Sequence, residues 1–181
     1  CRRGEVQYCT NGGVWGGGAL FGPDLQGGQT SYVRVPFADR CLTPIPDSVP
    51  DEQAVFVGDV FSTGYYAASE GHIEAGDIVV IYGCGPIGIG ALISAWQFGP
   101  REVVSVDVLP NRLALAKHYG ATVLDPSEGD VVERVKEMTN GLGADVVIEA
   151  IGNPVTFGQA LKSVRRGGRV SVVVLFPFPV E

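Results

Sequence analysis

The length, composition and charge of the chain exclude several classes of protein. Its 181 residues fit one domain, or one domain with part of another, and 45% apolar residues suffice for a buried core. The net charge of −7 argues against a nucleic-acid partner, and no apolar run approaches the ~20 residues of a membrane span. With no initiator Met and no signal segment, a chain that begins at Cys1 is expected to be a piece of a longer, cytoplasmic protein.

The first 57 residues predict a segment rich in turns and extended chain. Glycines cluster at positions 12–13, 16–18 and 27–28, as they do in loops. Gln29 to Val35 alternates polar and apolar residues and is rich in β-formers, which predicts a half-exposed strand. Pro50 to Ala54 opens a helix with proline and acidic side chains in its first turn. Because this segment is too irregular to bury a core alone, we assign residues 1–57 to part of a larger, β-rich domain.

The four cysteines are Cys1, Cys9, Cys41 and Cys84. A disulfide framework is not expected in a cytosolic chain of this size. Cys41 and Cys84 are interpreted as packing residues. Cys1 and Cys9 could be zinc ligands, but two thiolates do not close a structural site, so ordinary free thiols remain the alternative.

Asp59 is a lone acid among apolar neighbours in the predicted helical segment from Val55 to Glu70. It could be the N-cap of the helix that follows, or a carboxylate ligand for zinc. His72 and His118 are the possible imidazole partners, and neither has ligand spacing to Asp59. We interpret His72 as a loop residue and His118 as a residue near a helix C-terminus.

A continuous apolar run from Ile78 to Tyr82 predicts a strand buried on both faces of a parallel sheet. Gly83, Gly85 and Gly88 follow with the spacing G-x-G-x-x-G, and a helix continues to Phe98. Such glycines serve the tight turn, the approach of backbone to a pyrophosphate, and close packing of helix on strand. A chain with 26 glycines produces this spacing by chance, so the strand before it and the helix after it carry the inference.

Val103 to Asp107 predicts a second buried strand, which ends in a carboxylate. A carboxylate there can accept hydrogen bonds from an adenosine ribose, and its charge would repel the 2′-phosphate of NADP. Asp107 therefore favours NAD. Arg112 could reach a 2′-phosphate and so weakens this choice slightly. The alternative is that Asp107 only caps the helix that opens at Pro110.

The rest of the chain alternates helices and strands. Helices are expected over residues 111–119, 130–139 and 154–164, and strands over residues 121–125, 144–150 and 169–175. This alternation predicts an α/β fold with a doubly wound parallel sheet of the Rossmann type over residues 58–181, with five of the usual six strands. The fifth strand would be an apolar edge, so we also predict self-association.

Several of these features occur together in one family. They are Cys1 with Cys9, residues 27–33, Gly58-Asp59 with Ser62-Thr63-Gly64, Gly83 to Gly88, Asp107, and residues 167–170. In this order they resemble the middle of a zinc-containing medium-chain alcohol dehydrogenase, in the broad group with threonine, sorbitol and formaldehyde dehydrogenases. The resemblance implies that residues 1–57 are part of a GroES-like catalytic domain, and that the parent is a homo-oligomer acting on a small alcohol, polyol or aldehyde.

The resemblance also implies roles for individual residues. Cys1 and Cys9 would be the last two of four ligands of a structural zinc, and Asp59 a ligand of the catalytic zinc. Thr63 would lie beside the nicotinamide of NAD. The remaining cofactor contacts would be Gly83, Gly85, Pro86, Ile87, Gly88, Asp107, Arg112, Ala150, Gly152 and Leu175. The family's other catalytic ligands, an upstream Cys and a Gly-His-Glu, are absent, so the chain as given is expected to be catalytically incomplete.

Two rival hypotheses remain open. One is a zinc-free, NADPH-linked reductase of the same superfamily, against which Asp107 and the Cys1 and Cys9 pair argue. The other is a dinucleotide-binding module without catalysis of its own.

Overall fold

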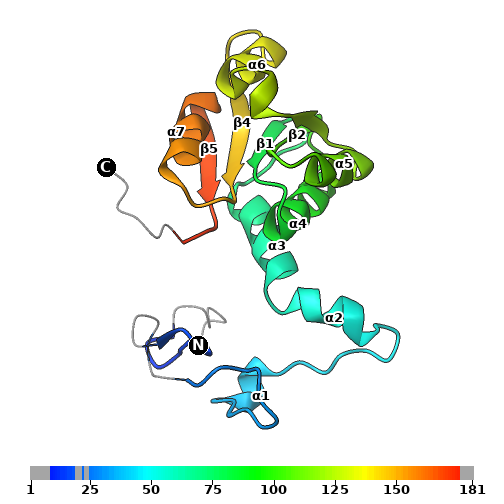
Figure 1. The fold of residues 1–181 in the computed structure, drawn as a ribbon, viewed down its shortest axis with the longest axis vertical. Coiled ribbons are helices and arrows are strands. Elements are labelled where there is room, and N and C mark those ends of the chain that lie inside the picture. Colours follow the sequence, from blue (N-terminus) through cyan, green and yellow to red (C-terminus); the bar gives the residue numbers. More distant parts are fainter. Residues whose placement is uncertain (1–8, 19–21, 23–24, 176–181) are drawn as a thin grey trace. The chain divides into compact units, whose positions relative to one another are not determined.

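The computed structural model of the protein describes residues 9–18, 22 and 25–175 (Figure 1). Its internal contacts divide the chain into two compact units, Cys1–Val49 and Pro50–Glu181. Within the described residues, no helix has the length and apolar character needed to cross a membrane.

The first unit contains little regular structure in its described residues. Helix α1 (Ala38–Cys41) is one turn long, and Trp15 and Leu25 form an isolated parallel bridge. The strand predicted over residues 29–35 is wrong: this stretch has no strand pairing, and Tyr32 is 93% exposed. A strand persists only where neighbouring backbone accepts its hydrogen bonds, and no described residue of this unit supplies such a neighbour. The assignment of residues 1–57 to a catalytic domain stays a prediction.

The second unit begins with two helices in place of one continuous helical segment. Helices α2 (Asp51–Val57) and α3 (Val60–Glu70) are separated at Gly58 and Asp59. Asp59 interrupts the helical backbone, with φ −144° and ψ −76°. Because α2 lies in the second unit, the division at Val49 and Pro50 differs from the boundary at 57/58 that the sequence predicted.

A five-stranded parallel sheet forms the centre of the second unit, and this confirms the predicted α/β, Rossmann-type part of the fold. Its strands are β1 (Ile78–Tyr82), β2 (Glu102–Val106), β3 (Thr122–Leu124), β4 (Ala144–Glu149) and β5 (Val164–Val172). The order is β3-β2-β1-β4-β5, and every neighbouring pair is parallel. Val80 of β1 pairs with Val104 of β2 on one side and Val147 of β4 on the other. The chain builds the sheet outward from β1 to β3 on one side and then from β4 to β5 on the other, so the two halves meet between β1 and β4.

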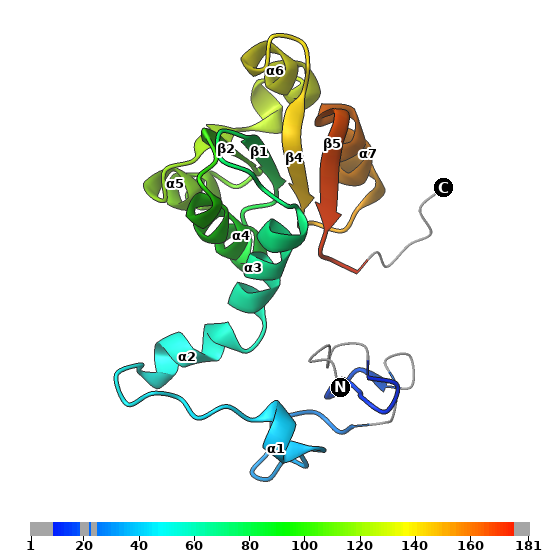
Figure 2. The same ribbon diagram turned by 180° about the vertical axis from the view of Figure 1, so that it is seen from behind.

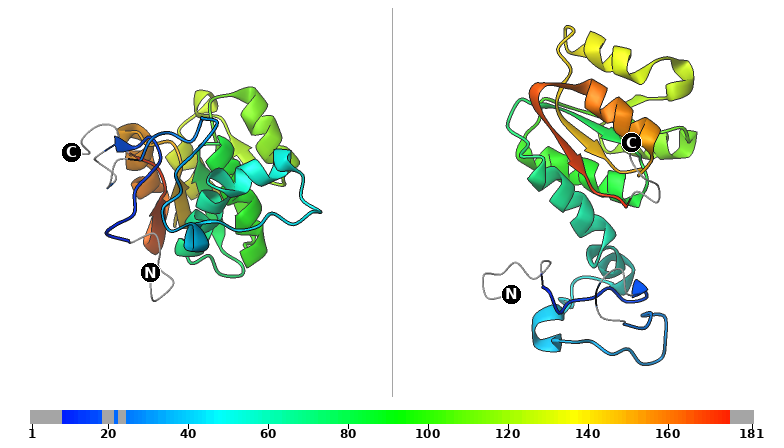
Figure 3. Two further views of the ribbon diagram at one scale, coloured as in Figure 1. Left: turned by 90° about the horizontal axis from the view of Figure 1, so that it is seen from below. Right: turned by 90° about the vertical axis from the view of Figure 1, so that its left-hand side faces the viewer.

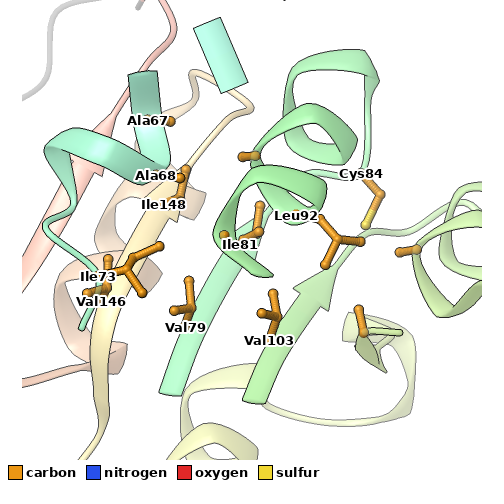
Figure 4. Close-up of a cluster of buried hydrophobic side chains, with 14 of the residues drawn as sticks. Ala67, Ala68, Ile73, Val79, Ile81, Cys84, Leu92, Val103, Val146 and Ile148 are labelled. Carbon is orange, nitrogen blue, oxygen red and sulfur yellow. The ribbon is translucent and has the colours of Figure 1, made fainter. Parts of the chain in front are cut away.

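Helices cover both faces of this sheet (Figures 2 and 3). Helices α3, α4 (Pro86–Ala95) and α5 (Pro110–His118) pack on one face, and α6 (Val131–Met138) and α7 (Pro154–Ser163) pack on the other. Strand residues alternate between the two cores: Ile81 lies with Leu92 of α4 (Figure 4), while Val80 lies with Val131 of α6. All five residues of β1 are buried, which is why its sequence is continuously apolar. Single turns of 3₁₀ helix follow α4 and β3, at Trp96–Phe98 and Pro126–Glu128.

Strand β5 starts earlier and ends earlier than predicted. It was expected over residues 169–175, after a turn at Gly167 and Gly168, but these glycines lie inside the strand. Its pairing with β4 is irregular, since Val164 pairs with Ala144 and the next paired residue is Arg169. Gly168 packs so closely that an added Cβ would lie 2.7 Å from the carbonyl oxygen of Asp145. As predicted, β5 is an edge of the sheet. Self-association through it stays a prediction.

Asp145 joins three strands at the amino edge of the sheet. Its carboxylate accepts a hydrogen bond from the Ile78 N–H at 2.8 Å and one from Arg165 Nε at 2.6 Å. Burial opposes ionisation of Asp145, but the Ile78 hydrogen bond and the Arg165 guanidinium outweigh it and lower the pKa of the carboxyl below its ordinary value.

Asp145→Asn is therefore expected to lower the free energy of unfolding at pH 7 by about 1 kcal/mol, the contribution of the lost hydrogen bond. A depressed folded-state pKa stabilises the protein above the ordinary pKa of 3.8 and ceases to do so as the pH falls through the folded value. The difference between variant and wild type should thus shrink below about pH 4. Urea unfolding of both proteins at pH 7 and pH 3 measures this difference in unfolding free energy. The same difference at both pH values would contradict a lowered pKa of Asp145.

Candidate functional site

A crevice opens at the carboxyl edge of the sheet, where β1 and β4 lead to opposite faces. The chain leaves β1 through Gly83 into α4, and leaves β4 through residues 150–153 into α7. The two turns and the end of β2 enclose a cavity of about 300 Å³. In open α/β sheets this switch point is where ligands bind. The cavity is lined by Tyr82, Gly83, Gly85, Val106, Asp107, Val108, Arg112, Pro126, Ala150, Ile151, Thr156 and Gln159.

The three motif glycines differ in what surrounds them. Gly83 has φ +98°, and an added Cβ would lie 2.8 Å from Ile151 Cγ1 in the opposite turn. An added Cβ at Gly88 would lie 1.8 Å from the carbonyl oxygen of Gly83, so only glycine lets α4 approach β1 this closely. At Gly85 the nearest atom to an added Cβ is Arg112 Nη1, at 4.0 Å. The space above Gly85 is therefore open.

Helix α4 begins immediately beside this open space. Gly85 is its N-cap residue, Pro86 is in its first turn, and no side chain caps its N-terminus. The first N–H groups of a helix have no partner within the helix, and together with the helix dipole they favour an anion. The glycine turn can therefore receive a phosphate group through backbone atoms.

Asp107 is 6% exposed and lies across the crevice from α7. One carboxylate oxygen accepts a hydrogen bond from the Cys84 N–H at 2.8 Å, and the other accepts one from the Leu109 N–H at 2.9 Å. Arg112 Nη1 lies 3.7 Å from the carboxylate. The idea that Asp107 merely caps α5 is wrong, because the N-cap residue of α5 is Leu109 and no side chain caps that helix. Each carboxylate oxygen has a second lone pair, so Asp107 can accept further hydrogen bonds.

Thr156 lines the crevice, and the buried Glu149 is hydrogen-bonded to it; sequence reasoning missed both residues. Glu149 ends β4 and is fully buried. Its Oε1 accepts hydrogen bonds from the Ile151 N–H at 3.1 Å and from Thr156 Oγ1 at 2.8 Å, and both of its oxygens lie within 3.2 Å of the Gly152 nitrogen. An acid that closes an apolar strand three residues before a glycine was the available signal.

Asp59 and Thr63 lie together at the start of α3. The Thr63 hydroxyl donates to Asp59 Oδ1 at 3.0 Å, and Asp59 is exposed. Asp59 occupies the N-cap position, but its side chain accepts no backbone N–H there.

Two residues that were predicted to contact the cofactor, Gly152 and Leu175, lie against each other. An added Cβ at Gly152 would lie 2.7 Å from the carbonyl oxygen of Leu175, so these two residues are packed together. The side chain of Leu175 is 73% exposed.

A sequence model described as "Zinc-binding dehydrogenase" matches residues 86–180, more than half of the chain. The chain belongs to the zinc-binding dehydrogenase family. It is 40% identical to an alcohol dehydrogenase of Cupriavidus necator over 155 residues, which cover 85% of this chain and 42% of that protein. It is 40% identical to zinc-type alcohol dehydrogenase B of Aspergillus flavus, over 94% of this chain and 42% of that protein.

A solved structure of a related enzyme supports the fold assignment of this dehydrogenase chain. Alcohol dehydrogenase TADH from Thermus sp. ATN1 superposes with a TM-score of 0.91 and 40% identity, over 99% of this chain and 53% of that one. The chain thus spans about half, or less, of the length of the relatives it matches.

The described residues of this dehydrogenase chain do not fit a zinc ion. Within residues 9–18, 22 and 25–175, no group of three or more His, Cys, Asp or Glu side chains could hold a metal. Cys9 and Cys41 are free thiols, and the predicted ligand Cys1 lies outside the described residues.

Cys84 belongs to the glycine turn, and its side chain is buried in the core cluster that contains Leu92 (Figure 4). Burial raises the pKa of its thiol to about 12, and the Asp107 carboxylate adds to the increase. The thiolate is the reactive form, so Cys84 should resist iodoacetamide at pH 8 while the exposed Cys41 reacts. Peptide mass spectrometry after timed labelling measures both residues, and labelling in denaturant is the control. Equal rates at Cys84 and Cys41 in the folded protein would contradict this burial.

Proposed function

We propose that the chain is the NAD-binding part of a zinc-dependent alcohol or polyol dehydrogenase. The observation that carries this proposal is the crevice at the switch point, where the uncapped N-terminus of α4 and the Asp107 carboxylate face one open space. A dinucleotide needs both features, an anion site for its pyrophosphate and an acceptor for its ribose hydroxyls. The similarity to alcohol dehydrogenases supports the reaction class.

The chain's residues would divide the binding of NAD among them. The backbone of Gly83 to Gly88, including Pro86 and Ile87, would hold the pyrophosphate, and Asp107 the adenosine ribose, with Arg112 beside it. Ala150, Gly152 and Leu175 would line the far side, and Thr63 would lie near the nicotinamide. The bound cofactor would supply the hydride acceptor, while the protein supplies orientation and exclusion of water.

The charge at Asp107 favours NAD over NADP. Its carboxylate is nearly buried, and the Arg112 guanidinium beside it is already paired with it at 3.7 Å. A 2′-phosphate would have to approach this carboxylate, and Arg112 is the only cation among the residues that line the crevice. The rival NADPH-linked reductase would need Arg112 to leave Asp107.

The metal roles concern the whole protein. We propose Asp59 as a catalytic zinc ligand, and Cys1 and Cys9 as structural zinc ligands, only in combination with residues that this chain lacks. The substrate, a small alcohol, polyol or aldehyde, and a homo-oligomeric, cytoplasmic state of the parent are proposals of the same kind.

Isothermal titration of the purified chain with NAD and with NADP tests this function, with zinc determined on the same sample. We expect saturable NAD binding at least about tenfold tighter than NADP binding, the difference that one unfavourable charge contact produces. Tighter binding of NADP would favour the zinc-free reductase instead. Detectable oxidation of an alcohol by the chain alone would exclude the non-catalytic module.

A further inference from the structure

Glu149 is a fully buried carboxylate with an unusual set of partners. Among the described residues, no cationic side chain forms an ion pair with it. Its charge is met by two backbone N–H groups, of Ile151 and Gly152, and by the Thr156 hydroxyl. A buried charge is costly unless it is hydrogen-bonded, so these three donors are held firmly around the carboxylate.

The partners of Glu149 belong to the turn that forms one wall of the crevice. Ile151 and Gly152 lie between β4 and α7, and Thr156 lies in the first turn of α7. Gly152 has φ +82°, a conformation that the bonds to Glu149 help to select. Asn153 caps α7 by accepting from the N–H groups of Val155 and Thr156. Glu149 thus ties the whole turn to the end of β4.

This turn also touches the phosphate-binding turn on the other side of the crevice. The Ala150 N–H donates to the carbonyl oxygen of Tyr82 at 2.9 Å, just before Gly83. Ile151 lies so close to Gly83 that an added Cβ there would meet its Cγ1 at 2.8 Å. Gly83 has a positive φ and, without a side chain, could adopt many backbone conformations. The Ile151 side chain beside it therefore limits which of these conformations are possible.

We propose that Glu149 is a positioning residue for dinucleotide binding, which acts through the turn 150–153 and sets the width of the crevice. It touches no nucleotide itself. Its three hydrogen bonds hold Ile151 against Gly83 and keep the turn organised before the ligand arrives, which reduces the entropy lost on binding. This inference rests on the proposed NAD site.

The test measures NAD affinity by isothermal titration for wild type, Thr156→Val and Glu149→Gln. Valine keeps the shape of threonine but removes the donor, and glutamine places an N–H group among N–H donors. We expect each to raise the Kd for NAD about five- to tenfold, roughly the net contribution of one ordinary hydrogen bond. Thr156→Ser, the conservative variant that keeps the hydroxyl donor, should bind NAD more tightly than Thr156→Val.

Asp145→Asn is the matched control. Asp145 is on the same strand and also accepts a backbone N–H, but at the opposite edge of the sheet. The Asp145→Asn substitution should lower thermal stability and leave the Kd for NAD within about twofold of wild type. Amide exchange measured without nucleotide should be faster at Ile151 and Gly152 in Thr156→Val, and unchanged there in Asp145→Asn.

The outcomes separate this inference from the function on which it rests. Wild type that binds no NAD overturns both. Wild type that binds NAD, with Thr156→Val and Glu149→Gln equal to it, overturns the role of Glu149 and leaves the NAD site standing. If Glu149→Gln does not fold, as judged by circular dichroism, Thr156→Val decides the question: a raised Kd with faster amide exchange at Ile151 and Gly152 supports the role of Glu149, and a raised Kd with unchanged exchange there overturns it.

Discussion

Gly88→Ala is expected to prevent the second unit from folding as a stable Rossmann-type domain. The added Cβ would lie 1.8 Å from the carbonyl oxygen and 2.8 Å from the carbonyl carbon of Gly83. Both are backbone atoms of the turn that leaves β1, so no flexible side chain can give way. Helix α4 would have to move off the sheet at the centre of one core, at a cost of about 4 kcal/mol or more. Far-UV circular dichroism and thermal unfolding measure the effect.

Two other glycines are matched controls for this substitution. An added Cβ at Gly158, in α7, meets nothing within 4 Å, so Gly158→Ala should stabilise the helix by about 0.5–1 kcal/mol. Gly85→Ala should fold normally, because only Arg112 lies near, at 4.0 Å, yet bind NAD about tenfold more weakly, since its methyl group enters the space for the pyrophosphate. A Gly88→Ala protein with wild-type stability would show that α4 does not need this close packing.

Asp107→Asn is expected to raise the Kd for NAD at least about tenfold and to reduce the preference for NAD over NADP. An amide has one acceptor oxygen, so it cannot accept from both the Cys84 and Leu109 N–H groups and also from a ribose hydroxyl. The change also removes the negative charge and leaves Arg112 without its partner at 3.7 Å, free to meet a 2′-phosphate.

Asp77→Asn controls for the loss of a carboxylate as such. Asp77 accepts the Glu74 N–H at 2.9 Å, at the start of β1 and away from the crevice. The Asp77→Asn substitution should leave the affinities for NAD and for NADP unchanged. Competition between NAD and NADP followed by titration calorimetry measures the ratio. An unchanged ratio in Asp107→Asn would mean that this carboxylate does not discriminate between the two nucleotides.

The sheet of the second unit could be predicted from the sequence because its central strands are buried on both faces. Residues 78–82 are a continuous apolar run followed by glycine, residues 144–149 are apolar apart from Asp145 and the closing Glu149, and each strand is followed by a helix. Parallel strands joined by helices leave few possible topologies, so the alternation of strands and helices was enough to predict a doubly wound parallel sheet. The turn at Gly83 and the acid at Asp107 could be found because their spacing is short and local.

The wrong predictions concern features that depend on distant partners. The strand over residues 29–35 had the right composition but has no neighbouring strand in the described part of its unit. Strand β5 begins early because Asp145 of β4 holds Arg165 beside it, which propensity could not show. Glu149 was missed because its partners are backbone N–H groups of a turn whose shape appears only in three dimensions.

The most direct test of the central claim is a titration of the ¹⁵N-labelled chain with NAD, followed by NMR. We expect the largest shifts at the amides of Gly83, Asp107 and Ile151, which line the crevice at the switch point. A second cavity of about 830 Å³ between α2, α4 and α5, lined by Phe56 and Ile93, offers the contrasting location. Shifts concentrated at Phe56 and Ile93, or no shifts at saturating NAD, would contradict the assignment of the crevice as the dinucleotide site.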